Sequence, residues 1–349
     1  MSTEKKKSAS EVIIDRFLAD VDERGTMPWQ RPYERYNAFN YFSKKAYRGI
    51  NRLMLPFGEY MTRNQITQYN LEKGYIELDS NGRLKSATPE AYKMQKGIKW
   101  YPVVFFKKDI KKMDKVTAES DLDKVIDLSV NKYWGRANGY LYYTNNGEVF
   151  KERSILRYYM VADRKHFRNE KGECLPSRID TGEVVISTQE PKQVFDSYIQ
   201  REGIHLTTNY TGTPCYIPML DEIKLNPYIK SEEAYFSVAF HEAGHSTGAE
   251  KRLNRAGVAE IDTQDKEKYA VEECIAEICA CLCCAETGIT DFETSGMAEY
   301  ENSIAYVQSW KKRILDWGKD FIYIVSQADK AFNYICNNPD GLVPTSEEE

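Results

Sequence analysis

Two histidines four residues apart, with a glutamate directly after the first, constrain this chain more than any other feature. They are His241, Glu242 and His245. On a helix, positions i and i+4 share a face, so both imidazoles can reach one ion. A zinc ion held in this way keeps open positions for water, and the intervening carboxylate can accept a proton from that water. The spacing therefore predicts a zinc site with Glu242 as the general base.

The sequence around the motif favours a helix. Ser231 is placed to cap its N-terminus, Glu232 and Glu233 suit the first turn, and Gly248 suits the end. The alternative is a pair of buried histidines that are satisfied by hydrogen bonds. We favour the metal site because the motif lies on the element that its mechanism requires.

A second helix, expected over residues 266–286, offers a third ligand. Val271 and Ile275 belong to its apolar stripe, and Glu273 and Glu277 fall on the opposite face. Two glutamates at this spacing repel each other, and a nearby cation relieves the repulsion. We therefore expect Glu273 to bind the metal and Glu277 to orient a ligand histidine. The alternative is a solvated acidic face that also contains Glu272.

Cysteine usage and hydropathy indicate a cytoplasmic protein. Five of the eight cysteines lie between Cys274 and Cys284, where neighbouring thiols on a helix point apart. This pattern suits a reducing compartment and small packing residues rather than a second metal site. The first residues are polar and lysine-rich, unlike a signal peptide, and no stretch reaches the roughly 20 apolar residues that span a bilayer.

Charge divides the chain into two halves. Residues 1–168 carry a net charge of +11 and residues 169–349 carry −16. Such asymmetry indicates two domains with different partners, and a polyanion suits the basic one. Residues 169–182 are polar and rich in turn formers, so we place the boundary there. The expected domains are residues 8–168 and 183–337.

The basic half alternates aromatic and cationic residues, a composition typical of proteins that bind single-stranded nucleic acid. The alternative is an aromatic core beneath a solvated lysine face. If the first interpretation holds, the DNA-binding candidates are Trp29, Lys44, Lys45, Tyr47, Arg48, Asn51, Lys99, Trp100 and Lys107.

Helical and strand patterns are mixed without a βαβ rhythm, which predicts an α+β fold. We expect helices over residues 10–24, 61–73, 90–95, 193–200, 297–316 and 319–336. We expect strands over residues 99–108, 155–162 and 203–208, and a hairpin turn at Asn146-Gly147. A proline-interrupted edge strand is expected between Tyr210 and Lys224, where an extended peptide could pair.

These motifs together resemble the ArdC-type antirestriction proteins of plasmids and other mobile elements. The resemblance covers about residues 10–335. The matching stretches are Tyr47–Asn51, Pro102–Phe105, Ala239–Gly248, Arg252–Arg255 and Tyr269–Glu277. It implies an N-terminal domain that binds single-stranded DNA and a C-terminal zincin-like metallopeptidase domain. It also implies a role in protecting or assisting incoming DNA during transfer, such as plasmid conjugation.

Two segments depart from the family pattern. Residues 133–153 look like an insertion. The stretch Ala162–His166 stands where the family has asparagine and glutamine before the domain boundary.

The sequence thus predicts a zinc-dependent peptidase joined to a single-stranded-DNA-binding domain, with an unnamed protein substrate and no membrane partner. A rival hypothesis is a DNA-binding protection protein whose zinc site is structural or vestigial. A third is a metal-dependent nuclease, which two histidines and one glutamate suit less well than a carboxylate-rich site would. Oligomeric state is not indicated by any pattern.

Overall fold

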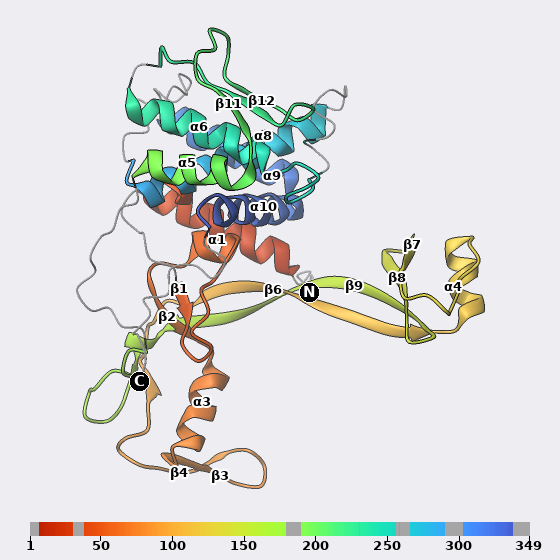
Figure 1. The fold of residues 1–349 in the computed structure, drawn as a ribbon. Helices are drawn as coiled ribbons and strands as arrows, with labels where there is room; N and C mark the ends of the chain where they lie inside the picture. Colours follow the sequence, from red (N-terminus) through yellow and green to blue (C-terminus); the bar gives the residue numbers. More distant parts are fainter. Residues whose placement is uncertain are drawn as a thin grey trace, which may run out of the picture. The chain divides into compact units, whose positions relative to one another are not determined.

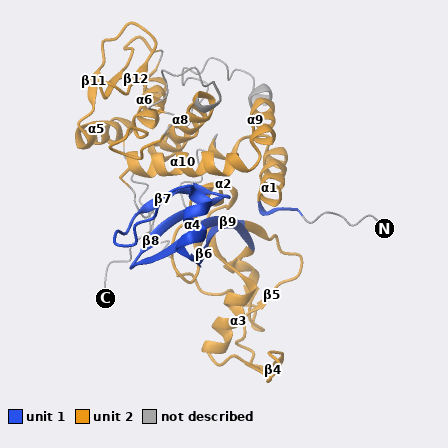
Figure 2. Cartoon of the chain, turned by 90° about the vertical axis from the view of Figure 1, so that its right-hand side faces the viewer, with its two compact units in different colours: residues 1–9, 103–159 blue, residues 10–102, 160–349 orange. Residues whose placement is uncertain are grey.

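A computed structural model describes residues 7–30, 38–178, 190–229, 231–255, 258, 266–289 and 303–337. The chain divides into two compact units (Figure 2). Unit 1 consists of residues 1–9 and 103–159, and unit 2 of residues 10–102 and 160–349. No helix in the described part of the chain has the length and apolar character that a membrane crossing needs.

Unit 1 is built on two long strands that pair with each other, β6 and β9 (Figure 1). Its elements are β6 (Tyr101–Met113), α4 (Lys115–Leu122), β7 (Tyr133–Ala137), β8 (Tyr140–Asn145) and β9 (Glu148–Asp163). The hairpin between β8 and β9 forms because Asn146 and Gly147 both adopt positive φ angles, 50° and 76°, as a type I′ turn requires. The hairpin predicted at this position is therefore confirmed.

The N-terminal part of unit 2 mixes short helices and strands around aromatic contacts. In α1, Ile13, Phe17 and Val21 form a buried stripe. Thr62 begins α3 with a capping box to Gln65. The elements are α1 (Ala9–Arg24), β1 (Ala38–Asn40), α2 (Ile50–Met54), β2 (Gly58–Met61), α3 (Arg63–Glu72), β3 (Ile76–Leu78), β4 (Leu84–Ala87), β5 (Lys93–Met94) and β10 (Phe167–Arg168), with single 3-10 turns η1 (Pro28–Gln30) and η2 (Arg164–His166).

One sheet contains six of the described strands. Its order is β1-β2-β9-β8-β7, and β6 also pairs with β9. The β1–β2 pair is parallel, and β2 runs antiparallel to the last residues of β9. The final strand predicted over residues 155–162 is therefore confirmed as the end of a longer strand.

The C-terminal part of unit 2 is mainly helical and carries a small sheet. Its elements are α5 (Pro191–Glu202), β11 (His205–Thr207), β12 (Cys215–Ile217), β13 (Glu222–Lys224), α6 (Glu232–Ser246), α8 (Lys266–Thr287), α9 (Ser303–Trp317) and α10 (Lys319–Ile335). Helices α6, α8 and α10 pack together (Figure 1). Their shared core contains Phe240, Cys279, Cys283, Cys284 and Phe332, so these cysteines are packing residues as predicted.

Two predictions about the first half were wrong. Residues 90–95 form no helix, because the Asn70 side chain holds the backbone of Tyr92 extended through hydrogen bonds of 2.9 and 3.1 Å. The strand expected over residues 99–108 continues to Met113 before Asp114 caps α4. The strand is longer than expected because cross-strand ion pairs with β9 hold its charged continuation in the ribbon.

Candidate metal centre

Helix α6 begins where the sequence predicted. The Ser231 hydroxyl accepts a 3.1 Å hydrogen bond from the Ala234 amide, and two glutamates in the first turn favour the helix dipole. The helix then runs to Ser246 with its apolar side buried. His241 and His245 therefore share one face of a helix whose start and packing are fixed by its own sequence.

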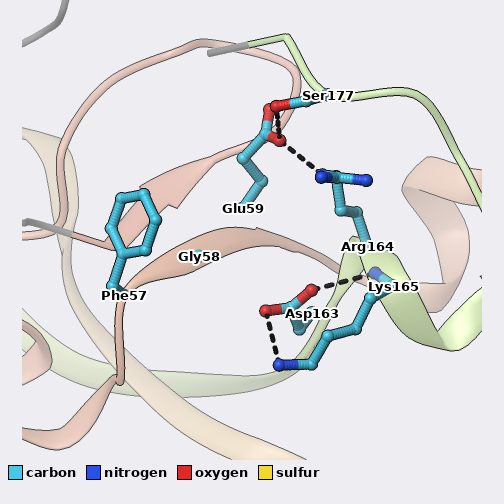
Figure 3. A pocket seen from close by; sticks show the side chains of 7 residues that line it. All are labelled: Phe57, Gly58, Glu59, Asp163, Arg164, Lys165 and Ser177. Carbon is cyan, nitrogen blue, oxygen red and sulfur yellow. Dashed lines mark hydrogen bonds and ion pairs between the residues drawn. The ribbon is translucent and has the colours of Figure 1, made fainter. Parts of the chain in front are cut away.

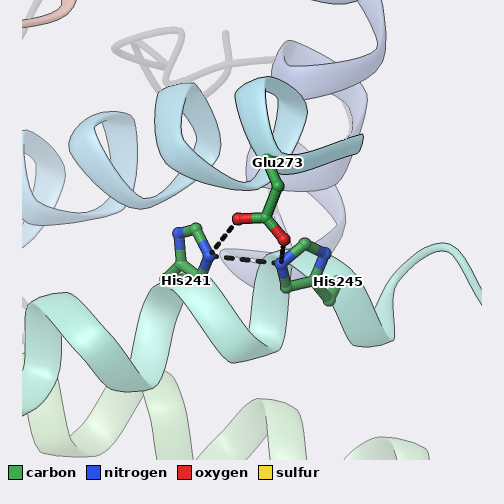
Figure 4. Close-up of side chains that lie close together, drawn as sticks. All are labelled: His241, His245 and Glu273. Atoms are coloured by element: carbon green, nitrogen blue, oxygen red, sulfur yellow. Dashed lines mark hydrogen bonds and ion pairs between the residues drawn. The ribbon is translucent and has the colours of Figure 1, made fainter. Parts of the chain in front are cut away.

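Close packing of α6 against α8 depends on two small residues. A Cβ atom placed on Gly244 would lie 3.1 Å from the Ala276 Cα and 3.3 Å from the Ala276 carbonyl oxygen. Such contacts are tighter than ordinary side chains allow, so glycine permits the approach. As a result, Glu273, which lies one turn before Ala276 on α8, reaches the histidine face of α6 (Figure 4).

The three predicted donors converge. The His241 and His245 Nε2 atoms lie 3.1 Å apart, and each lies 3.5 Å from an oxygen of Glu273. All three donor atoms lie within 4.8 Å of one another. Tetrahedral zinc with ligand bonds of about 2.05 Å would separate its donors by about 3.3 Å. The side chains present therefore fit a divalent ion.

The electrostatics of the cluster also favour a cation. Burial alone raises the pKa of Glu273, but a hydrogen bond from His241 and the charges of both histidines bring that pKa to about 2. Burial lowers the pKa of His241, but the Glu273 hydrogen bond, followed by the charge of Glu242, outweighs it and leaves that pKa raised. The Glu273 carboxylate is therefore ionised, and the carboxylates around His241 favour positive charge at this position.

Glu242 is buried, with 7% of its surface exposed. Its charge acts on His241 beside it and on two groups from other elements. Burial, and then the Glu242 charge, raise the pKa of the Cys215 thiol on β12. The Tyr269 hydroxyl, which bonds to Glu273, has its pKa raised to about 12 by that bond, by burial and by the charges of Glu273 and Glu242. The Glu242 charge therefore acts both on the ligand His241 and on Cys215 of β12.

A neighbouring carboxylate, Glu272, contacts the far ring nitrogen of His245. Its Oε1 lies 3.3 Å from His245 Nδ1, and only 1% of the residue is exposed. The role predicted for Glu277, the orientation of a ligand histidine, stays a prediction. Glu277 is half-buried, and its charge acts on His241. One signal could have identified Glu272, because it lies on α8 in line with buried Ile275 and Cys279.

A buried arginine holds Glu272 in place. Arg255 donates to the Glu272 carboxylate through Nε at 2.9 Å and Nη2 at 2.6 Å. It also bonds the Gly244 carbonyl at 2.8 Å and the Thr247 hydroxyl at 2.7 Å. Sequence reasoning assigned Arg255 no role beyond the family stretch that contains it. The structure makes it the link between α6, α8 and the loop that follows the metal helix.

The small sheet beside α6 runs in the order β11-β13-β12, so β12 is at its edge among the described strands. β12 pairs antiparallel with β13, with Tyr216 opposite Ile223, and packs on α6. An edge strand was predicted in this region, and its position beside α6 suits an extended peptide.

Three predicted DNA-binding residues are buried. Trp29 is 1% exposed, with its ring 4.8 Å from Trp310, and Tyr47 and Asn51 are 8% and 9% exposed. A base cannot stack on a ring that is already covered by protein. We therefore propose no DNA contact for Trp29, Tyr47 or Asn51.

The remaining DNA-binding candidates differ in environment. Lys44, Lys45 and Arg48 are exposed in the loop before α2. Lys99 forms ion pairs with Glu23 and Asp20 of α1, which offset its charge. Trp100 is half-buried against an aromatic cluster, and Lys107 is exposed on β6.

A pocket in unit 2 lies where the sequence departs from the family pattern (Figure 3). Glu59 accepts bonds from Arg164 and Ser177, each at 2.6 Å, and Asp163 accepts from the Lys165 amide at 2.9 Å. Both carboxylates already accept hydrogen bonds from groups of the protein. These bonds connect β2 to the end of β9, and we do not interpret the pocket as a metal site. The predicted boundary at 169–182 runs partly outside the described residues and stays a prediction.

Two family models match the chain in succession. Residues 7–134 match the N-terminal domain of anti-restriction factor ArdC, and residues 193–327 match a zincin-like metallopeptidase domain. The second match contains all three clustered donors. The chain therefore carries an ArdC-type N-terminal domain followed by a zincin-like metallopeptidase domain. The predicted α+β class, with an ArdC-like N-terminal domain and a zincin-like C-terminal domain, is confirmed.

Solved structures agree on the fold. The metal-free crystal structure of the antirestriction ArdC protein from plasmid R388 has a TM-score of 0.55 and 24% identity, over 94% of this chain and 97% of that one. The Mn(II)-bound structure of the same protein gives a TM-score of 0.51 and 23% identity.

Among characterised sequences, two Escherichia coli proteins named DNA primase TraC are similar over 95% of this chain. They are 25% identical over 339 residues and 24% identical over 341 residues. The chain spans only 20% and 27% of the length of these relatives.

Proposed function

We propose that the C-terminal domain hydrolyses peptide bonds at a divalent metal ion, with zinc as the first choice. The observation that carries this proposal is the triangle of His241, His245 and Glu273 donors, with spacings of 3.1 to 3.5 Å. Two imidazoles and a carboxylate suit zinc, and three protein ligands leave a position for water. The Mn(II)-bound relative makes manganese the alternative metal.

The protein's own groups supply the rest of the chemistry. A bound ion would polarise water and the substrate carbonyl. Glu242 is proposed to take the proton of the attacking water, because it follows His241 directly on the helix that packs on the edge strand. The free edge of β12 is proposed to hold the substrate extended. Glu272 and Arg255 keep His245 oriented.

Activity of a Glu242→Gln variant tests the peptidase. Wild-type protein loaded with zinc should cleave a denatured protein such as casein, and the variant should be at least about 100-fold slower. Its metal content should stay unchanged, because Glu242 is not a proposed ligand. A wild-type protein that binds zinc but cleaves nothing, together with a variant that still protects DNA, would support the structural or vestigial site instead.

We also propose that the N-terminal half binds single-stranded DNA in an antirestriction role. The ArdC N-terminal match and the net charge of +11 over residues 1–168 support this. Anisotropy of a labelled oligo(dT) with the full chain should show log K falling linearly with log salt concentration, with a slope of about −0.7 for each phosphate contact. Absent binding, or binding that ignores salt, would contradict the proposal.

A further inference from the structure

The β6–β9 ribbon of unit 1 has two faces of different chemistry. Successive side chains of a strand point to opposite faces, so odd-numbered and even-numbered residues separate. Contacts between the strands confirm the separation. Phe105 lies 5.5 Å from Tyr159 between ring centroids, and Asp109 lies 3.0 Å from Arg153. On the other face, Lys108 lies 2.9 Å from Glu152. Each contact joins residues of the same parity.

The odd face is strongly basic. Within the ribbon segments 105–112 and 148–159, its charged residues are Lys107, Asp109, Lys111, Lys151, Arg153 and Arg157. Their net charge is +4. The single acid, Asp109, is shared by Arg153 at 3.0 Å and Lys111 at 3.9 Å. This face therefore keeps an excess of positive charge that its own residues do not balance.

The even face of the same segments is neutral. Lys108 pairs with Glu152 and Lys112 pairs with Glu148. Ile110, which is 48% exposed, lies between these pairs, and Phe106, which is 59% exposed, lies two residues before Lys108 on the same face. The ribbon thus has one basic face and one neutral face, and the neutral face, whose residues are also exposed, can serve as the control for the basic one.

Aromatic rings accompany the cations on the odd face. Phe105 is 42% exposed and forms the ring pair with Tyr159. Tyr140 of β8 lies beneath three cations, with Lys151 at 4.9 Å, Arg153 at 4.8 Å and Lys111 at 5.9 Å from its ring centre. Cations that follow a backbone, interleaved with rings on which bases stack, are the features of a surface for single strands.

We propose that the odd face of the β6–β9 ribbon is the surface that contacts a single-stranded nucleic acid. This inference rests on the proposed DNA binding and locates it. Much of the surface lies on β9, outside the residues that match the ArdC N-terminal domain. Phosphates would lie along the cations, and bases would stack on Phe105 and Tyr159. Charge complementarity decides the partner, because the neutral even face offers a polyanion nothing comparable.

Two double variants of the full chain test the proposal. Lys107→Ala with Arg157→Ala removes two charges from the odd face, and Lys108→Ala with Lys112→Ala removes two from the even face. Both change the net charge equally, but they act on different faces, and the two even-face lysines are paired with glutamates. At about 0.1 M salt, losing two phosphate contacts should weaken oligo(dT) binding about 25-fold and reduce the salt slope by about 1.4. The even-face variant should bind nearly as well as wild type.

A matched pair of ring variants tests stacking. Phe105→Ala should weaken binding about five-fold or more, whereas Phe106→Ala should have little effect although Phe106 is more exposed. Circular dichroism would confirm that all four variants are folded as the wild type is.

The outcomes separate the two proposals. If wild type does not bind oligo(dT), the DNA-binding function itself fails. If wild type binds and the two double variants lose affinity equally, DNA binding stands and the odd-face assignment is wrong. If duplex DNA binds as tightly through the same residues, the preference for single strands is wrong.

Discussion

At the scale of single residues, the metal centre depends on a buried ion pair that touches no substrate. Arg255 is 5% exposed and Glu272 is 1% exposed. Burial raises the pKa of Glu272, but hydrogen bonds from Arg255 and His245 outweigh it and hold that pKa below its usual range. The ionised carboxylate is therefore positioned to fix the ring of His245.

Replacing these partners should separate stability from metal binding. Arg255→Ala leaves a buried carboxylate without its guanidinium and should lower the free energy of unfolding by about 3–5 kcal/mol, measured by urea denaturation. Glu272→Gln keeps the shape but loses the charge, and should weaken zinc binding about 10–100-fold in competition with a chelating indicator. Glu277→Gln is measured beside it, and a larger loss there than in Glu272→Gln would favour the sequence-based prediction that Glu277 orients a ligand histidine.

A second ion pair predicts a pH dependence. Asp221 accepts bonds from Arg252 at 2.7 Å, Lys251 at 2.8 Å and the Tyr216 hydroxyl at 2.8 Å. Burial alone raises the pKa of Asp221, but these partners outweigh it and lower that pKa. The stabilisation is therefore complete above the unfolded pKa of about 4 and is lost as pH falls through the lower folded pKa.

The urea midpoints of wild type and Asp221→Asn should therefore differ by a constant amount between pH 5 and pH 7, and should converge below about pH 4. A difference that grows on acidification would contradict this assignment of charge.

At the scale of elements, the contact between α6 and α8 assembles the site. Gly244→Val should force the helices apart, because even a Cβ would lie 3.1 Å from the Ala276 backbone. We expect a loss of about 1–3 kcal/mol in stability together with weaker zinc binding. Ala270→Val, at an exposed position of α8, is the control. Unchanged zinc affinity in Gly244→Val would show that the site does not need this close contact.

Elements with strong local signals were predictable from the sequence, and elements defined by distant partners were less so. The spacing of His241 and His245, the Ser231 cap and the Asn146-Gly147 turn each act within a few residues, and each was placed correctly. The extent of β6 depends on β9, some 40 residues later, and was underestimated. Trp29 could not be recognised as a core residue, because the ring that covers it, Trp310, comes from α9.

The same limit applies within the site. The two neighbouring carboxylates Glu272 and Glu273 differ only by the helix rotation between them. Which of them faces the histidine donors and which faces Arg255 depends on how α8 lies on α6, and a single sequence does not state that geometry.

At the scale of the whole molecule, the chain combines two chemistries in one polypeptide. A basic half carries a ribbon with one cationic face, and an acidic half carries three converging metal ligands. We therefore expect that single substitutions can weaken metal binding or DNA binding without affecting the other. Changes on the odd face should leave metal binding intact, and changes at the metal ligands should leave DNA affinity intact.

Zinc stoichiometry of purified protein tests the central claim most directly. After equilibrium dialysis against buffered zinc, the wild type should hold one equivalent by elemental analysis. His241→Ala, His245→Ala and Glu273→Ala should each lose it, whereas Lys107→Ala should keep it. A His241→Ala variant that retains one equivalent of zinc would contradict the assignment of the metal centre.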